Sequence, residues 1–297
     1  MDSGSADFWI GGEGCKSESG GDCVRMIPHR SIRSVLTFLP TAQGNHVFLG
    51  SKSSSTFKDT GKSWEITYGS GHVTGDIVTD NVKLAGLALD NLTFGIALVE
   101  SSDFTSDPTT DGLLGTAKSS ISNQGLPTPV EVLAQKGLIS QPITSYKISR
   151  LSDGLNDGEI TFGGLDQSKY DASSLVTFKN VNKDGFWEGG FTVSVNGKSL
   201  GLNGRTAILD TGTTLIIAPD ADAKAIHAKI PGSKTDSQGD YIIPCTNTAV
   251  VSFTFSGRTF NINPIDLLFV PVDNNNLKGD CYSGIAAGTI GTAEEWL

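Results

Sequence analysis

The sequence has few charged residues and no long apolar run. Charged residues make up 18% of the 297 positions, below the roughly one quarter that is usual in globular proteins. No stretch approaches the about 18 consecutive apolar residues of a membrane-spanning helix, so we expect no membrane span. The net charge is −10. Nucleic-acid binding depends largely on clustered Lys and Arg, so we also expect no nucleic-acid partner.

Patterns typical of metal ligands are also missing. The chain has four cysteines and four histidines, but no Cys-x-x-Cys pair and no ligand-like histidine spacing, so we expect no metal and no other cofactor. The even number of cysteines favours two disulfides formed in an oxidising compartment. A single glycosylation sequon, Asn91-Leu92-Thr93, fits export. The given sequence opens with Met1 and Asp2 and shows no signal peptide, so we expect either that the export signal is missing from this sequence or that the protein stays inside the cell.

The chain is rich in turn residues and in short alternating apolar runs. It holds 36 Gly and 11 Pro, and the alternation predicts strands rather than long helices. Strands are expected over residues 64–68, 75–82, 92–99, 143–148, 159–162, 191–195, 250–255 and 258–262. Hairpin turns are expected at Asn196-Gly197 and Ser256-Gly257. Helices are expected over 128–137, which opens with a capping box, and over 219–230, and one helical turn is expected over 264–268. His72 and His227 are expected at the surface or half-buried, with no catalytic task. The prediction is a mainly β fold.

Two copies of one short motif carry the candidate chemistry. Each has the form Asp-[Ser/Thr]-Gly-[Ser/Thr], and the copies are Asp2-Ser3-Gly4-Ser5 and Asp210-Thr211-Gly212-Thr213. The second copy follows the apolar residues 207–209, so its aspartate leaves a strand and enters a tight glycine turn. The neighbouring hydroxyls are suited to orient the carboxylate, because a buried acid without partners is costly.

With further motifs, these two loops make the chain resemble the pepsin-like aspartic endopeptidases of the secreted or vacuolar fungal kind. The motifs are DSGSADFW at 2–9, YGSG at 68–71, DGLLG at 111–115, GEITFGGLD at 158–166 and ILDTGTTLI at 208–216. The resemblance implies an all-β, bilobal fold with pseudo-twofold symmetry, with an N-terminal lobe over 1–170 and a C-terminal lobe over 171–297. It also implies that Asp2 and Asp210 share a water and hydrolyse peptide bonds of proteins by acid–base catalysis, at acidic pH.

The same resemblance implies roles for the other candidate residues. Tyr68 is expected to be the flap tyrosine, with Trp9 hydrogen-bonded to it, Gly69 and Ser70 to meet the substrate chain, and Leu113 to line a pocket. The residues expected to support the two aspartates are Ser3, Gly4, Ser5, Thr211, Gly212 and Thr213. The expected disulfides are Cys15–Cys23 and Cys245–Cys281. The partner is a protein or peptide bound as an added strand, and we expect a monomer that is secreted or vacuolar.

Residues 24–43 do not fit this pattern. The segment has neither strand alternation nor a helical stripe, and it holds three of the arginines. One interpretation is a surface insertion in the N-terminal lobe, because long loops cost little free energy. The other is a retained intron, since the codon for Val24 must begin with GT and that for Gln43 can be CAG. Transcript sequencing distinguishes the two.

The internal duplication suggests that the chain is truncated at both ends. An apolar strand leads into Asp210, whereas only Met1 precedes Asp2. The segment Leu113-Leu114-Gly115 has no complete repeat after Cys281, so the C-terminal lobe is expected to be incomplete. We therefore hypothesise an incomplete gene model. The alternative function is a catalytically impaired pepsin-like homologue that binds peptides or proteins, or an inactive fragment.

Overall fold

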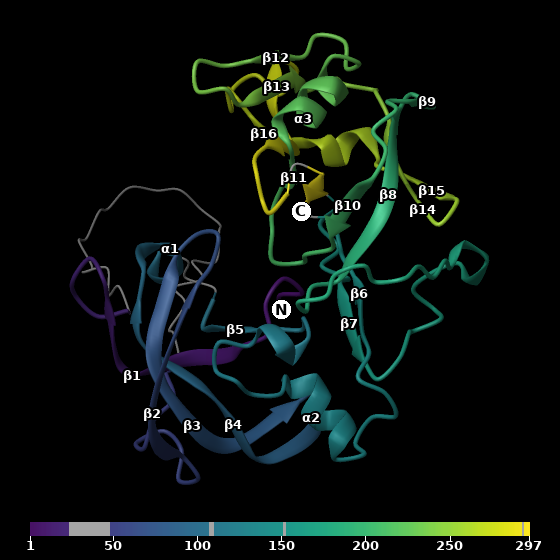
Figure 1. Cartoon of the computed structure of the whole chain (residues 1–297). Coiled ribbons are helices and arrows are strands. Elements are labelled where there is room, and N and C mark those ends of the chain that lie inside the picture. The colour runs from purple at the N-terminus through teal and green to yellow at the C-terminus, as the bar shows by residue number, and fades with distance from the viewer. Residues whose placement is uncertain (24–47, 107–109, 151–152, 293) are drawn as a thin grey trace. The chain divides into compact units, whose positions relative to one another are not determined.

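The computed structural model describes residues 1–23, 48–106, 110–150, 153–292 and 294–297. These residues form two compact units, Met1–Lys169 and Tyr170–Leu297. Both units consist mainly of strands with a few short helices (Figure 1), so the predicted all-β class is confirmed. The segment 24–43 lies outside the described residues. In the part of the chain that is described, no helix is long and apolar enough to cross a membrane.

A five-stranded sheet organises the first unit. In order across the sheet, its strands are β2 (Lys58–Thr67), β3 (His72–Leu84), β4 (Leu87–Glu100), β1 (Phe8–Ser17) and β5 (Gly112–Leu114). Strand β1 runs parallel to β4 and antiparallel to β5. In Figure 1, β2, β3 and β4 are the long blue strands; they contain the predicted strands 64–68, 75–82 and 92–99 in whole or in large part, and β3 pairs antiparallel with both β2 and β4.

Short helices and a separate hairpin complete this unit. Helix α1 (Ser102–Thr105) follows β4, and η1 (Ser119–Ile121) and α2 (Pro129–Gln135) follow β5. The predicted capping box of α2 is present: Thr128 Oγ1 accepts from the Glu131 amide at 3.2 Å, and Glu131 Oε2 accepts from the Thr128 amide at 3.0 Å. Such reciprocal bonds satisfy amides that the helix itself leaves unpaired.

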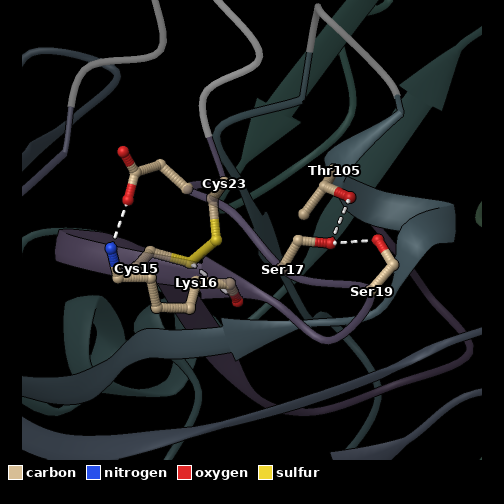
Figure 2. Close-up of a disulfide and its surroundings, with 7 residues drawn as sticks. Cys15, Lys16, Ser17, Ser19, Cys23 and Thr105 are labelled. Carbon is tan, nitrogen blue, oxygen red and sulfur yellow. Dashed lines mark hydrogen bonds and ion pairs between the residues drawn. A yellow bond between two sulfur atoms is a disulfide. The ribbon is translucent and has the colours of Figure 1, made fainter.

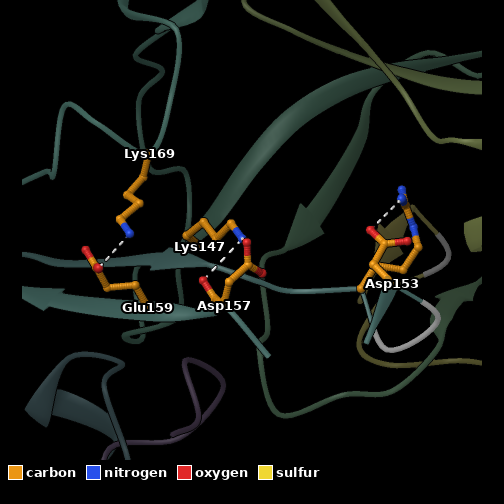
Figure 3. Close-up of polar contacts among 6 residues, drawn as sticks. Lys147, Asp153, Asp157, Glu159 and Lys169 are labelled. Atoms are coloured by element: carbon orange, nitrogen blue, oxygen red, sulfur yellow. Dashed lines mark hydrogen bonds and ion pairs between the residues drawn. The ribbon is translucent and has the colours of Figure 1, made fainter. Parts of the chain in front are cut away.

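Both strands predicted at 143–148 and 159–162 are present, as β6 (Thr144–Lys147) and β7 (Glu159–Phe162), and they pair antiparallel. Ion pairs link residues on and beside this hairpin (Figure 3): Lys147 Nζ lies 2.5 Å from Asp157, and Lys169 Nζ lies 2.9 Å from Glu159. The Lys147 ammonium lowers the pKa of Asp157, and the Glu159 carboxylate raises the pKa of Lys169. These side chains are partly solvated, so each pair adds little stability.

The described part of the second unit consists of three sheets, one α-helix and two 3-10 helices, the first of them η3 (Ala172–Ser174). The largest sheet has the order β15 (Arg258–Asn261), β14 (Val251–Phe255), β8 (Glu188–Val195), β10 (Arg205–Ile208) and β19 (Glu295–Trp296), with β9 (Lys198–Ser199) beside β8. A second has the order β12 (Lys234–Thr235), β13 (Tyr241–Pro244), β17 (Asp280–Ser283) and β16 (Leu268–Pro271). The third pairs β11 (Ile216–Ala218) with β18 (Ile285–Ala287).

The core of the second unit lies between these sheets and α3 (Asp220–His227). It includes Val193, Val251, Ile285 and Ile226, each at most 2% exposed. Helix α3 is shorter than the predicted 219–230, because the segment after His227 continues only as turns. The expected helical turn after Asn263 is the 3-10 helix η4 (Pro264–Leu267).

Two sequence predictions about local detail have opposite outcomes. Both hairpin turns are confirmed: Asn196 and Gly197 have φ of 50° and 74°, and Ser256 and Gly257 have φ of 47° and 82°, the left-handed pairs that match strand twist. His227, in contrast, was expected at the surface or half-buried, and this was wrong. It is 3% exposed, its ring stacks on Tyr241 with centroids 3.8 Å apart, and its Nε2 lies 2.9 Å from Ser283 Oγ.

Candidate active site

The loop that follows Met1 holds the first aspartate in a buried position. Asp2 is 6% exposed. Its Oδ1 accepts a hydrogen bond from the Gly4 amide at 2.8 Å, and its Oδ2 accepts one from the Ser5 hydroxyl. Its backbone bonds to the end of β5 and to Thr116: the Asp2 amide donates to Leu114 O, and the Thr116 amide donates to Asp2 O. The carboxylate is therefore oriented by its own loop and placed by the segment 112–116.

The second aspartate is held by the same two kinds of donor. Asp210 is half-buried and follows β10. Its Oδ1 accepts from the Gly212 amide at 2.8 Å, and its Oδ2 accepts from Thr213 Oγ1 at 2.6 Å. Both loops thus place a glycine amide two residues after the aspartate and a hydroxyl three residues after it. Ser3 is buried and Thr211 is half-buried, at the corresponding positions of the two loops.

The backbone around the two loops is equivalent as well. After the first loop, Trp9 pairs with Gly95 in parallel and with Leu113 in antiparallel. After the second loop, Ile217 pairs with Ala286 in parallel and exchanges both backbone hydrogen bonds with Leu297 at 2.8 and 3.0 Å. Leu297 therefore takes in the second unit the position that Leu113 takes in the first.

Asp7 was not among the predicted site residues, yet it anchors the first loop. Its carboxylate is almost completely buried, at 1% exposure, and accepts four hydrogen bonds. The donors are Ser122 Oγ at 2.6 Å, Asn123 N at 2.9 Å, Asn123 Nδ2 at 3.2 Å and Gln124 N at 3.0 Å. Since a buried carboxylate is tolerated only when hydrogen-bonded, this contact ties the loop to a segment far along the chain. Local spacing could not reveal it.

The predicted pair of Tyr68 and Trp9 is in contact. Trp9 Nε1 donates to Tyr68 Oη at 2.7 Å. Burial raises the pKa of Tyr68 far above its usual value, the hydrogen bond from Trp9 opposes this, and the charges of Asp7 and Asp2 add to it. The phenol is therefore neutral at acidic and at neutral pH. Gly69 and Ser70, next in the turn between β2 and β3, are exposed.

Phe104 of α1 supports this pair, a placement that the sequence did not indicate. Its ring meets Trp9 edge-on at 5.2 Å and Tyr68 at 5.4 Å, between centroids. Leu113 packs against the same apolar cluster around Trp9. Several contacts hold α1 in place. The His72 amide donates to Ser101 Oγ at 3.0 Å, the Ser101 amide donates to His72 O at 3.0 Å, and Ser17 Oγ lies 3.3 Å from Thr105 Oγ1 (Figure 2).

In the second unit a buried ion pair anchors the strand that leads to Asp210. Asp222 of α3 accepts from Arg205 Nε at 2.6 Å and from Arg205 Nη2 at 3.0 Å. Trp296 Nε1 also donates to Asp222, at 3.1 Å. The Asp222 side chain is 1% exposed and that of Arg205 is 20% exposed. A bidentate guanidinium–carboxylate pair with a third donor fixes the direction of β10.

Both predicted disulfides are present. Cys15 bonds to Cys23, with Cα atoms 5.4 Å apart, at the end of β1 (Figure 2). Cys245 bonds to Cys281, with Cα atoms 5.0 Å apart. The one group of metal-capable side chains found among the described residues is Cys15, Cys23 and Glu100. Its two sulfurs are bonded to each other, so they are not available as thiolate ligands.

Comparison with known proteins agrees with this geometry. Residues 1–295 match the family model described as eukaryotic aspartyl protease. Among curated proteins, the chain is 34% identical to the probable aspartic-type endopeptidase CTSD of Trichophyton verrucosum, over 100% of this chain and 52% of that protein. It is 36% identical to rhizopuspepsin-1 of Rhizopus niveus, over 97% of this chain and 67% of that protein. It is 37% identical to syncephapepsin of Syncephalastrum racemosum, over 85% of this chain and 64% of that protein.

The chain spans about half the length of the first of these relatives. The family match nevertheless extends over both units and over both aspartate loops. The chain therefore belongs to the eukaryotic aspartyl protease family.

Proposed function

We propose that the protein is an aspartic-type endopeptidase that hydrolyses peptide bonds of proteins at acidic pH, with Asp2 and Asp210 as its catalytic pair. The observation that supports this most directly is the equivalence of the two loops. Each carboxylate is oriented by a glycine amide on one oxygen and by a hydroxyl on the other. Two carboxylates with the same hydrogen-bond donors suit a reaction in which both act on one water molecule.

In the proposed reaction the two carboxyl groups hold one proton between them. Two carboxylates within hydrogen-bond reach cannot both ionise cheaply, so one remains protonated over a range of acidic pH. The ionised aspartate takes a proton from the water, whose oxygen bonds to the peptide carbonyl carbon. The other aspartate donates its proton to the carbonyl oxygen. The aspartate that took the water proton then donates it to the amide nitrogen, the C–N bond of the tetrahedral intermediate breaks, and a hydroxyl proton of the intermediate passes to the other aspartate as the carboxyl product forms.

The turn between β2 and β3 is the proposed flap over the substrate. Gly69 and Ser70 are exposed at this turn, while Tyr68 is fixed from below by Trp9. The substrate is an extended peptide that adds to this hairpin as a strand, with Leu113 lining one pocket and Ser3 and Thr211 bracing the aspartate loops. We propose a monomer that is secreted or vacuolar. The alternative of an impaired binding homologue is not favoured, because both aspartates and Tyr68 are retained.

Casein cleavage at about pH 4, with and without pepstatin, tests the proposal. Pepstatin-sensitive cleavage is expected, and it should be lost in Asp2→Asn and in Asp210→Asn. A matched control is Asp240→Asn, since Asp240 is exposed and its carboxylate bonds to no described residue. Cleavage that survives Asp210→Asn in a folded protein, or that pepstatin does not inhibit, would exclude the proposed mechanism.

A further inference from the structure

A β-bulge interrupts the hairpin of β3 and β4 at the sequon. Asp80 pairs with Leu92 and Val82 pairs with Leu89, so Asn81 alone faces two residues of β4, Asp90 and Asn91. One extra residue on one strand is the definition of a bulge. Asn91 takes φ of 53°, in the left-handed region that asparagine tolerates better than most residues. The backbone N–H of Asn91 donates to Asn81 Oδ1 at 2.9 Å, which closes the bulge.

The bulge turns the Asn91 side chain to solvent although its strand is largely buried. Leu89 and Leu92, on either side of the bulge, are 0% and 4% exposed. Asp90 and Asn91 between them are exposed. The Asn91 carboxamide makes no hydrogen bond to any described residue. In a regular strand, either Asp90 or Asn91 would point toward the core. The bulge leaves both exposed, and the side-chain carboxamide of Asn91 faces outward without a structural role.

We propose that Asn91 is a site of N-linked glycosylation. Thr93 supplies the hydroxyl of the acceptor sequon, which is the single Asn-x-[Ser/Thr] in the sequence. The donor is a lipid-pyrophosphate-linked oligosaccharide. The bond between Asn91 Nδ2 and the anomeric carbon forms, and the bond from that carbon to the pyrophosphate oxygen breaks. The amide loses one proton, and the lipid pyrophosphate leaves with the electron pair. No oxidation or reduction is involved.

The folded protein can hold the modified side chain without rearrangement. A glycan is bulky and hydrated, so it must project from the surface, and Asn91 already does so. Two disulfides are consistent with folding in the oxidising compartment where such transfer takes place. The site is also distant from the proposed flap. Asn91 lies opposite Asn81, nine residues along β3 from His72, which is roughly 30 Å at the usual strand rise.

The test is expression of the full chain behind a heterologous export signal in a yeast that glycosylates secreted proteins. Digestion with an N-glycan-removing amidase should increase the gel mobility of the secreted wild type. Peptide mass spectrometry should find Asn91 converted to Asp by the enzyme. Because the sequence holds one sequon, the mobility shift reports on this site alone. The readout does not depend on proteolytic activity, so failure of the proposed function would leave it unaffected.

Three variants make the test specific. Asn91→Gln and Thr93→Ala should abolish the shift completely, and Thr93→Ser should retain it because the hydroxyl remains. Thr93→Ala leaves Asn91 in its bulge, so it separates loss of the glycan from any strain at φ of 53°. A secreted wild type whose mobility the amidase does not change, or a shift that persists in Asn91→Gln, would overturn the proposal.

Discussion

The buried pair of Arg205 and Asp222 offers a quantitative test of how the second aspartate loop is supported. Replacement of Arg205 by Met leaves the Asp222 carboxylate buried, with Trp296 Nε1 as its remaining donor among the contacts described. Removal of one partner from a buried ion pair costs about 3–5 kcal/mol. We expect Arg205→Met to reduce the free energy of unfolding of the second unit by this amount.

Urea unfolding followed by tryptophan fluorescence measures the effect. Trp296 is 1% exposed in the native protein, so its emission reports unfolding of the second unit directly. With a urea dependence of about 2 kcal/mol per M, the midpoint should fall by roughly 2 M. The transition of the first unit, which contains Trp9 and Trp64, should be unchanged. The two units are expected to unfold as separate steps if their midpoints differ.

A matched control and a double variant decide the interpretation. Lys234 and Asp280 form an exposed pair at 2.7 Å, with side chains 57% and 39% exposed, so Lys234→Met should cost less than about 1 kcal/mol. Arg205→Met combined with Asp222→Leu should be less destabilising than Arg205→Met alone, since no unpaired charge remains. The reasoning is refuted if Lys234→Met and Arg205→Met lower the urea midpoint equally. It is also refuted if the double variant of Arg205 and Asp222 is less stable than Arg205→Met alone.

Two further predictions concern His227 and Tyr68. Burial lowers the pKa of His227 below its usual value, so the unfolded chain binds a proton before the folded one does as pH falls below about 6.5, and the free energy of unfolding should decrease with falling pH in this range. In urea titrations at a series of pH values, His227→Gln should show a smaller decrease than wild type, and equal decreases would contradict the prediction. Tyr68→Phe leaves Trp9 Nε1 without its acceptor, which costs about 1–3 kcal/mol. Trp9→Phe is also destabilising, because the indole is 1% exposed and its loss leaves a cavity; in a double-mutant cycle the cost of the double variant should be smaller than the sum of the two single costs, and additive costs would exclude the hydrogen bond as the cause. In the proposed protease assay, kcat/KM should fall about tenfold for Tyr68→Phe.

The features that could be predicted from sequence are those encoded over a few residues. The capping box of Thr128 and Glu131, the turn at Asn196 and the orientation of Asp210 by Gly212 and Thr213 each depend on groups within three positions of one another. Side chain and backbone then meet because local geometry brings them together. The disulfides and the Trp9–Tyr68 contact are long-range, and they were predicted through the resemblance to a family rather than from spacing.

The residues that were missed have partners chosen by tertiary packing. Asp7 bonds to Ser122 and its neighbours, more than a hundred positions away. Phe104 meets Trp9 and Tyr68 because α1 is held against β1 and β3. His227 has polar atoms and sits on a short helix, which suggests a surface position, yet its hydrogen bonds to Ala223 O and to Ser283 permit burial. Nothing in a local window indicates such partners.

The two aspartate loops combine an identical local design with different support. Five residues after Asp2 the first loop has Asp7, which accepts four hydrogen bonds and fixes the loop to 122–124. Five residues after Asp210 the second loop has Leu215, which can accept none through its side chain. The second loop is instead held by the strand that precedes Asp210, through the hydrogen bonds of Arg205 to Asp222. The geometry at each carboxylate is therefore local, whereas its rigidity is supplied separately in each unit, so loss of one anchor should loosen one aspartate and leave the other in place.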